Sequence, residues 1–148
     1  MSAAAIEVML RAGRKRKAAP RKAPKKNADV PLEEDDQVAL IKWFDDWAPA
    51  ELQGRLAASS GGARMAMKTA VRQKRAGSRK GYPDLNLLTQ RRGFAGLFIE
   101  LKRLKGGRLE PEQADWLDFL KQGYMAVVCV GLEAAKRTII DYLGTTNE

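Results

Sequence analysis

The sequence contains no histidine among its 148 residues. This absence excludes Ser-His and Cys-His nucleophile systems, histidine-dependent nuclease motifs and zinc sites built on histidine. The single cysteine, Cys129, lies in the apolar run 126–130, where we expect a small buried side chain. One cysteine cannot form an intramolecular disulfide, so the chain fits a reducing compartment.

Long apolar runs are also absent. No run reaches the roughly 18–20 residues that cross a bilayer, and the apolar stretch at the N-terminus is too weak for a secretory signal. We therefore expect a cytoplasmic protein with no membrane partner. The apolar fraction of 45% is typical of a folded chain, and the length fits one domain with a tail.

The positive charge of the chain is concentrated at its N-terminus. Residues 1–30 carry nine Lys or Arg against Glu7 and Asp29, which gives +7 of the chain's net charge of +9. We expect residues 1–30 to be a disordered basic tail and residues 31–148 to form the folded domain. Such a tail suggests a polyanionic partner, most often nucleic acid; the alternative is a solubilising tail with no specific partner.

The first predicted element is a helix that begins at Pro31 and ends before Pro49. The acidic residues 33–36 suit the positive end of its dipole. Its apolar positions follow a helical stripe: Val38, Leu40, Ile41, Phe44 and Trp47. Residues 50–80 have a weaker pattern, in which 59–62 predict a loop, 64–74 a short basic helix and 77–81 a basic loop.

The second half of the chain predicts three strands and two helices. Strands are expected at 85–88 and 96–102, and a helix is expected at 111–122, where Gly123 stops it. The third strand, 124–130, is apolar throughout and is therefore expected to be central and covered on both faces. A last helix is expected at 132–143. This order predicts an α/β fold with a mixed sheet, helices on its faces and a β-α-β crossover.

Two short motifs carry the residues suited to catalysis. Residues 81–85 give the pattern G-x-P-D, and residues 99–102 give E-x-K at the end of an apolar run. Side chains two apart in a strand face the same way, so Glu100 and Lys102 point to one side and Leu101 points into the core. Asp84 and Glu100 are then expected at the tips of two neighbouring strands.

Two converging carboxylates with no histidine available form a hard oxygen site, for which Mg²⁺ or Mn²⁺ is the natural occupant. Lys102 can hold or activate an attacking water and offset phosphate charge. Such a site would hydrolyse a phosphodiester. The alternative is that Asp84 caps a turn, while Glu100 and Lys102 form an ordinary pair on a solvated face.

These motifs resemble the VRR-NUC (virus-type replication-repair nuclease) branch of the PD-(D/E)XK nucleases, in particular its stand-alone phage and bacterial members. The matching segments are 81–85, 96–102, Pro111-Glu112-Gln113-Ala114-Asp115-Trp116-Leu117 and Gly123-Tyr124. The helix start at 34–37 matches the family's N-terminal acidic position. The resemblance covers about residues 33–143 and implies a restriction-endonuclease-like mixed β-sheet flanked by helices, in a single domain.

The resemblance also implies a role for each matched residue. The implied catalytic set is Glu34, Asp84, Glu100, Lys102 and Gln113. The implied metal ligands are Asp84, Glu100 and the backbone carbonyl of Leu101. Glu33 stays open as an alternative to Glu34, and Gln113 also suits a capping position of its own helix.

The implied activity is that of a divalent-metal-dependent DNA endonuclease, selective for branched DNA such as Holliday junctions, which acts in replication, recombination or repair as a homodimer. Basic residues near the motifs would contact phosphates, and these contacts set affinity rather than sequence choice. The expected contact residues are Arg64, Lys68, Arg72, Lys74, Arg79, Lys80, Arg103, Lys105 and Arg108. The alternatives are a non-catalytic basic DNA-binding or architectural module, and a sequence-specific restriction-like nuclease, against which the small size counts.

Overall fold

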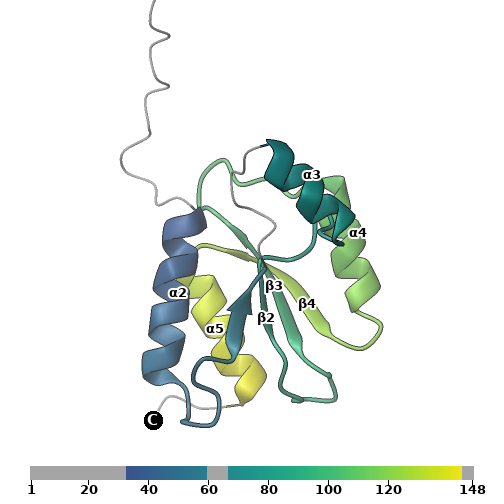
Figure 1. Cartoon of the computed structure of the whole chain (residues 1–148). Coiled ribbons are helices and arrows are strands. Elements are labelled where there is room, and N and C mark those ends of the chain that lie inside the picture. Colours follow the sequence, from purple (N-terminus) through teal and green to yellow (C-terminus); the bar gives the residue numbers. More distant parts are fainter. Residues whose placement is uncertain (1–32, 60–66, 145–148) are drawn as a thin grey trace, which may run out of the picture.

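The computed structural model describes residues 33–59 and 67–144. The predicted tail at 1–30, Arg64 and most of the predicted loop at 59–62 therefore lie outside the described residues. Figure 1 shows a sheet with helices on both sides. In chain order the elements are α2 (Glu33–Trp47), β1 (Leu56–Ala58), α3 (Met67–Arg75), β2 (Leu85–Leu87), β3 (Leu97–Lys102), α4 (Pro111–Leu120), β4 (Met125–Val130) and α5 (Leu132–Leu143).

The four strands form one mixed sheet in the order β1-β2-β3-β4. The pairs β1–β2 and β2–β3 are antiparallel, whereas β3 and β4 are parallel and joined by α4. The predicted β-α-β unit and the mixed α/β sheet are thus confirmed. None of the helices in the described part of the chain is long and apolar enough to span a bilayer.

Helices α2 and α5 cover one face of the sheet, and α4 covers part of the other (Figure 1). The first face holds the larger core, in which Phe44, Ile99, Ile139 and Tyr142 have no exposed surface. Burying each such side chain contributes about 1.5–3 kcal/mol. On the second face a smaller cluster joins Phe98 of β3 to Leu117 of α4. The outcome is a three-layer arrangement with β3 in its middle.

The stripe predicted for α2 is correct except for one residue. Leu40 and Phe44 are fully buried, and Ile41 and Trp47 pack against the core. Val38, however, is 66% exposed. Two residues along a helix correspond to about 200° of rotation, so Val38 lies on the opposite side from Leu40.

The prediction that strand 124–130 is central and covered on both faces is wrong. β4 is the last strand of the sheet, and Val128 and Val130 are 39% and 48% exposed. Both valines lie on the α4 side, where that helix packs against Ala126 but leaves the far end of the strand open. The strand that is buried on both faces is β3, all six of whose residues are buried.

Strand β1 was missed by the sequence pattern. Its three residues, Leu56, Ala57 and Ala58, pair with β2, but only Leu56 is buried. Alanine favours helices over strands, and three residues are too few for an alternation to be visible. The backbone of this strand nevertheless extends to the candidate site, because Ser59, directly after it, donates its N–H to the carbonyl of Asp84 at 2.8 Å.

Candidate active site

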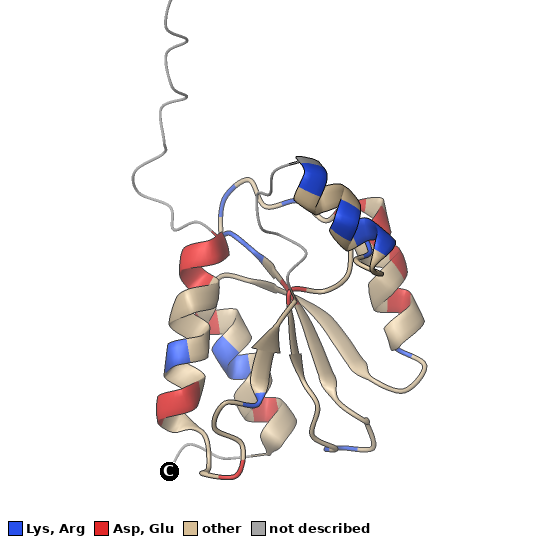
Figure 2. Cartoon of the chain, viewed as in Figure 1, with Lys and Arg blue, Asp and Glu red and all other residues tan. Residues whose placement is uncertain are grey.

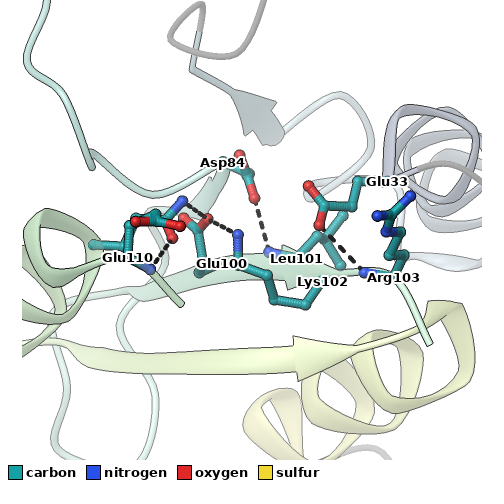
Figure 3. A network of polar contacts seen from close by, with 8 residues as sticks. Glu33, Asp84, Glu100, Leu101, Lys102, Arg103 and Glu110 are labelled. Carbon is teal, nitrogen blue, oxygen red and sulfur yellow. Dashed lines mark hydrogen bonds and ion pairs between the residues drawn. The ribbon is translucent and has the colours of Figure 1, made fainter. Parts of the chain in front are cut away.

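The centre of the candidate site lies at the end of β3. Glu100 and Lys102 share the α4 face of the strand with Phe98, whereas Leu101 belongs to the core on the other face. The side chains of Glu100 and Lys102 are only 2% and 9% exposed, and Lys102 Nζ lies 3.0 Å from Glu100 Oε1 (Figure 3). Because the pair is buried, the alternative of an ordinary pair on a solvated face is excluded. A buried charge pair is costly unless further groups satisfy it.

Asp84 precedes β2 and is held against β3. Its Oδ2 accepts a hydrogen bond from the backbone N–H of Leu101 at 2.8 Å (Figure 3). The N–H and C=O of one strand residue point to the same edge, so the Leu101 carbonyl also points toward the Asp84 side. Continuing the β2–β3 register places Pro83 opposite Leu101. Proline has no N–H, so Pro83 cannot donate a hydrogen bond to the Leu101 carbonyl and continue the β2–β3 pairing.

Gln113, in the first turn of α4, fixes the Glu100 carboxylate. Its Nε2 donates to Glu100 Oε1 at 2.5 Å, and its Oε1 accepts a hydrogen bond from the Glu110 N–H at 2.8 Å. The second contact is one half of a capping box. The two interpretations of Gln113, as a helix cap and as a neighbour of the site, therefore both hold.

The other oxygen of Glu100, Oε2, is buried and lacks a hydrogen-bond partner among the described residues. Asp84 lies near enough for its negative charge to raise the pKa of Glu100. A divalent cation between the two carboxylates would offset this repulsion, so the donor set fits Mg²⁺ or Mn²⁺.

The pKa values of both carboxyl groups are raised. Burial raises the pKa of Glu100 to about 7, with a further contribution from the negative charge of Asp84, and Lys102 opposes the shift. Burial also raises the pKa of Asp84, which the Leu101 N–H and Lys102 partly offset. Perturbed carboxyl groups of this kind occur where burial and like charges are combined, which is common at functional sites.

Of the two candidate acids on α2, Glu33 lies beside the site. Its Oε1 accepts a hydrogen bond from the Arg103 N–H at 3.4 Å, and its charge raises the pKa of Asp84 and of Glu100 (Figure 3). Glu34 is exposed to solvent. Adjacent residues in a helix point about 100° apart, so only one of them can face the sheet end.

The cation ligands offered here are two carboxylates and a carbonyl. Among the described residues no group of three Asp, Glu, Cys or His side chains forms a metal-binding cluster. A Mg²⁺-type site does not require such a cluster, because Mg²⁺ keeps several waters and takes one or two carboxylates from the protein. Asp84, Glu100 and the Leu101 carbonyl would hold it.

A glycine brings the two motifs together. Gly81 has a φ of +84°, and a Cβ at this position would lie 2.7 Å from the backbone nitrogen of Gln113. The loop that carries Asp84 can therefore approach the first turn of α4 only because residue 81 has no side chain. Lys80 reinforces the contact through an ion pair with Glu112 at 2.8 Å.

The basic residues predicted to bind DNA lie around the site. Figure 2 shows Lys and Arg on the outer side of α3 and on the loop that follows β3. The exposed members of the predicted set are Lys68, Arg72, Lys74, Arg79, Lys80, Arg103, Lys105 and Arg108. Lys80 is engaged by Glu112, so its charge is partly neutralised. The outer side of α4 is acidic.

Comparisons with known proteins point in one direction. The model of the VRR-NUC domain family matches residues 23–132. A solved structure described as a "VRR_NUC domain protein" matches with a TM-score of 0.67 and 27% identity, over 77% of this chain and 89% of that chain. A search of curated proteins found no match.

Replacing Gly81 tests the close approach of the two motifs. We expect Gly81→Ala to lower the free energy of unfolding by at least about 2 kcal/mol, because the new Cβ combines an unfavourable φ with a backbone clash. Gly54→Ala is the matched control, with a φ of +73° and no atom within 4 Å of the new Cβ. Equal losses for the two variants in urea unfolding would contradict a steric role for Gly81.

The raised pKa of Glu100 predicts a pH-dependent stability without metal. Between the ordinary value near 4.5 and the folded value of about 7 the folded state binds more protons, so stability falls as pH rises. In EDTA we expect the free energy of unfolding to drop by about 2 kcal/mol from pH 5 to pH 8. Glu100→Gln should remove most of this drop, and Glu51→Gln, at an exposed site, should preserve it. A drop that persists in Glu100→Gln would contradict the assignment.

Proposed function

The chain belongs to the VRR-NUC family, and from this premise we propose that it is a divalent-metal-dependent DNA endonuclease selective for branched DNA. The observation that carries the proposal is the buried pair of Glu100 and Lys102 with the half-buried Asp84 and Gln113 beside it, in which Glu100 Oε2 has no donor among the described residues. The proposed setting is replication, recombination or repair in the cytoplasm.

A bound Mg²⁺ or Mn²⁺ would supply a Lewis acid and a water of lowered pKa. The roles of the chain's own residues follow from their contacts. Asp84 is fixed by the Leu101 N–H, and Glu100 is fixed by Gln113 and Lys102, so both carboxylates are held in place before substrate arrives. This preorganisation avoids reorganising charges during the reaction.

Lys102 is placed to orient the attacking water. Its ammonium group is anchored 3.0 Å from Glu100 Oε1 and is almost fully buried. The ammonium has three N–H donors, so it can hold a water while it is bound to Glu100. Its positive charge also offsets the charge that develops on the phosphate. Glu33, at the start of α2, would bind a further water at the edge of the site.

The DNA backbone is proposed to lie over the basic surfaces on either side of the site. One is the exposed surface of α3, with Arg72 and Lys74, and the other is the loop after β3, with Arg103 and Lys105 (Figure 2). The acidic site between them would repel phosphate if no cation were bound. Metal should therefore promote binding as well as cleavage.

We further propose a homodimer, so that two sites can cut two strands. The edge of β4, which has no partner strand among the described residues, and the uncovered face beside it, where Val128 and Val130 are exposed, are a suitable surface for a second copy, because an unpaired strand edge readily adds another strand. The full chain should then sediment at twice its mass of 16.4 kDa. Val130→Lys should shift it to monomer; a wild-type monomer at micromolar concentration would contradict the dimer.

Cleavage of a labelled four-way junction and a matched linear duplex tests the activity. In Mg²⁺ or Mn²⁺ the wild type should cut the junction preferentially, EDTA should stop cutting, and Glu100→Gln should reduce it at least about a hundredfold. Asp118→Asn, on the exposed side of α4, is the control and should cut normally. Metal-independent, salt-sensitive binding with no cutting of either substrate would instead support the non-catalytic DNA-binding module.

The same assay separates the two acids of α2. Glu33→Gln should lower the cleavage rate about tenfold, because it removes a charge next to the metal site. Glu34→Gln should leave it unchanged, because Glu34 faces solvent. The opposite ranking would show that Glu34 supplies the helix acid.

A further inference from the structure

A pocket of about 420 Å³ lies between the C-terminal end of α3 and the loop that carries Asp84. This volume falls within the range of about 300–1,000 Å³ that is typical of small-ligand sites. Ser59 and Tyr82 form part of its wall. Ser59 donates its N–H to the carbonyl of Asp84 at 2.8 Å, and Tyr82 is two residues before Asp84. The pocket and the metal ligand therefore share one loop.

Gln73, at the end of α3, contributes to the wall of this pocket. Its Oε1 is buried and has no hydrogen-bond partner among the described residues, so the amide reaches a ligand by turning toward the pocket. A hydrogen bond to the ligand would then satisfy this oxygen. A carboxamide can both accept and donate, which matches the mixed donors and acceptors on the edge of a nucleobase.

The end of α3 makes the pocket better suited to a neutral ring than to a phosphate. Gly77 has a φ of +103°, and Ser78 donates its N–H to the Gln73 carbonyl at 2.9 Å, which closes the helix. The C-terminal end of a helix carries partial negative charge and disfavours anions. Arg79, exposed at the pocket, would instead hold the phosphate attached to the ring.

Tyr82 gives the pocket a fixed aromatic wall. Its ring packs edge-to-face on Trp116 at 5.1 Å and lies 6.0 Å from Phe98, centroid to centroid. Tyr82 also belongs to the pocket wall, so contacts with α4 and β3 hold an aromatic residue in place beside the pocket. Stacking on such a ring is a general way to bind an unpaired base whatever its sequence.

We propose that this pocket receives one unpaired nucleobase of the DNA substrate, next to the phosphodiester that is cut. The proposal rests on the proposed function for its ligand, DNA, and for the phosphodiester that is cut beside the pocket. A paired and stacked base cannot enter such a pocket, so DNA with an unpaired nucleotide at a branch or bulge is selected. Selectivity for branched DNA then comes from a pocket in each subunit, in addition to the spacing of two sites in a dimer.

Binding of duplexes with one bulged nucleotide tests this proposal without cleavage. The full chain is titrated in Ca²⁺ and in EDTA against duplexes that bear a bulged adenosine, a bulged thymidine or a bulged abasic residue. The wild type should bind both bulged bases about tenfold more tightly than the abasic residue. Equal affinity for base and abasic DNA would overturn the proposal.

Two variants connect the preference to this pocket. Ala76→Phe fills the pocket from its wall, and Gln73→Ala removes the amide; each should reduce the preference to about twofold or less. Ala70→Phe is the matched control, because Ala70 is exposed on α3 and does not contribute to the pocket. A preference that survives Ala76→Phe, or is equally lost in Ala70→Phe, would overturn the proposal.

The outcome for this pocket is separable from that of the proposed nuclease activity. Metal-dependent cutting with no preference for a bulged base would support the nuclease activity and contradict the base pocket. A base preference that depends on Gln73, in a protein that cuts no DNA, would support the base pocket and contradict the nuclease activity.

Discussion

A carboxylate and an ammonium on the buried face of the central strand are the constraint around which this structure is built. Glu100 and Lys102 occupy positions that an ordinary α/β core would give to apolar side chains, and they are almost inaccessible to solvent. Their pairing alone does not compensate for the loss of hydration. Three neighbouring elements therefore converge on them. Helix α4 supplies the Gln113 amide, β2 is preceded by Asp84, and α2 begins with Glu33.

The residues that position these elements are not themselves catalytic. Gly81 permits the contact between the Asp84 loop and α4, and Pro83 leaves the position opposite Leu101 without an N–H. Directly after the short strand β1, Ser59 donates its N–H to the Asp84 carbonyl. Ser59 also lines the pocket at the end of α3, so this hydrogen bond connects the pocket wall to the Asp84 loop. We propose that the site, the base pocket and the basic residues of α3 contact the same nucleic acid.

Period-two alternation and short motifs were enough to predict β3, its parallel pairing with β4 through α4, and the meeting of Asp84 with Glu100 and Lys102. They were not enough for β4, in which Met125, Val127 and Cys129 face the larger core, whereas only Ala126 is buried on the other face. The exposure of the two valines depends on how α4 crosses that face. The choice between Glu33 and Glu34 depends on the rotation of α2 against the sheet. The contact at Gly81 and the Gln73 Oε1, which lacks a partner among the described residues, arise from backbone and side-chain packing, which no pattern in the chain encodes.

The position of a bound cation tests the central claim most directly. Crystals grown with Mn²⁺ should show one strong anomalous scattering peak within about 2.0–2.3 Å of a carboxylate oxygen of Asp84, an oxygen of Glu100 and the Leu101 carbonyl oxygen. The rest of its coordination shell should be water. A peak at that position would establish that the buried carboxylates are arranged around a metal. The account would be contradicted if Mn²⁺ occupied another site fully while the Glu100–Lys102 ion pair stayed unaltered and no peak appeared next to Glu100.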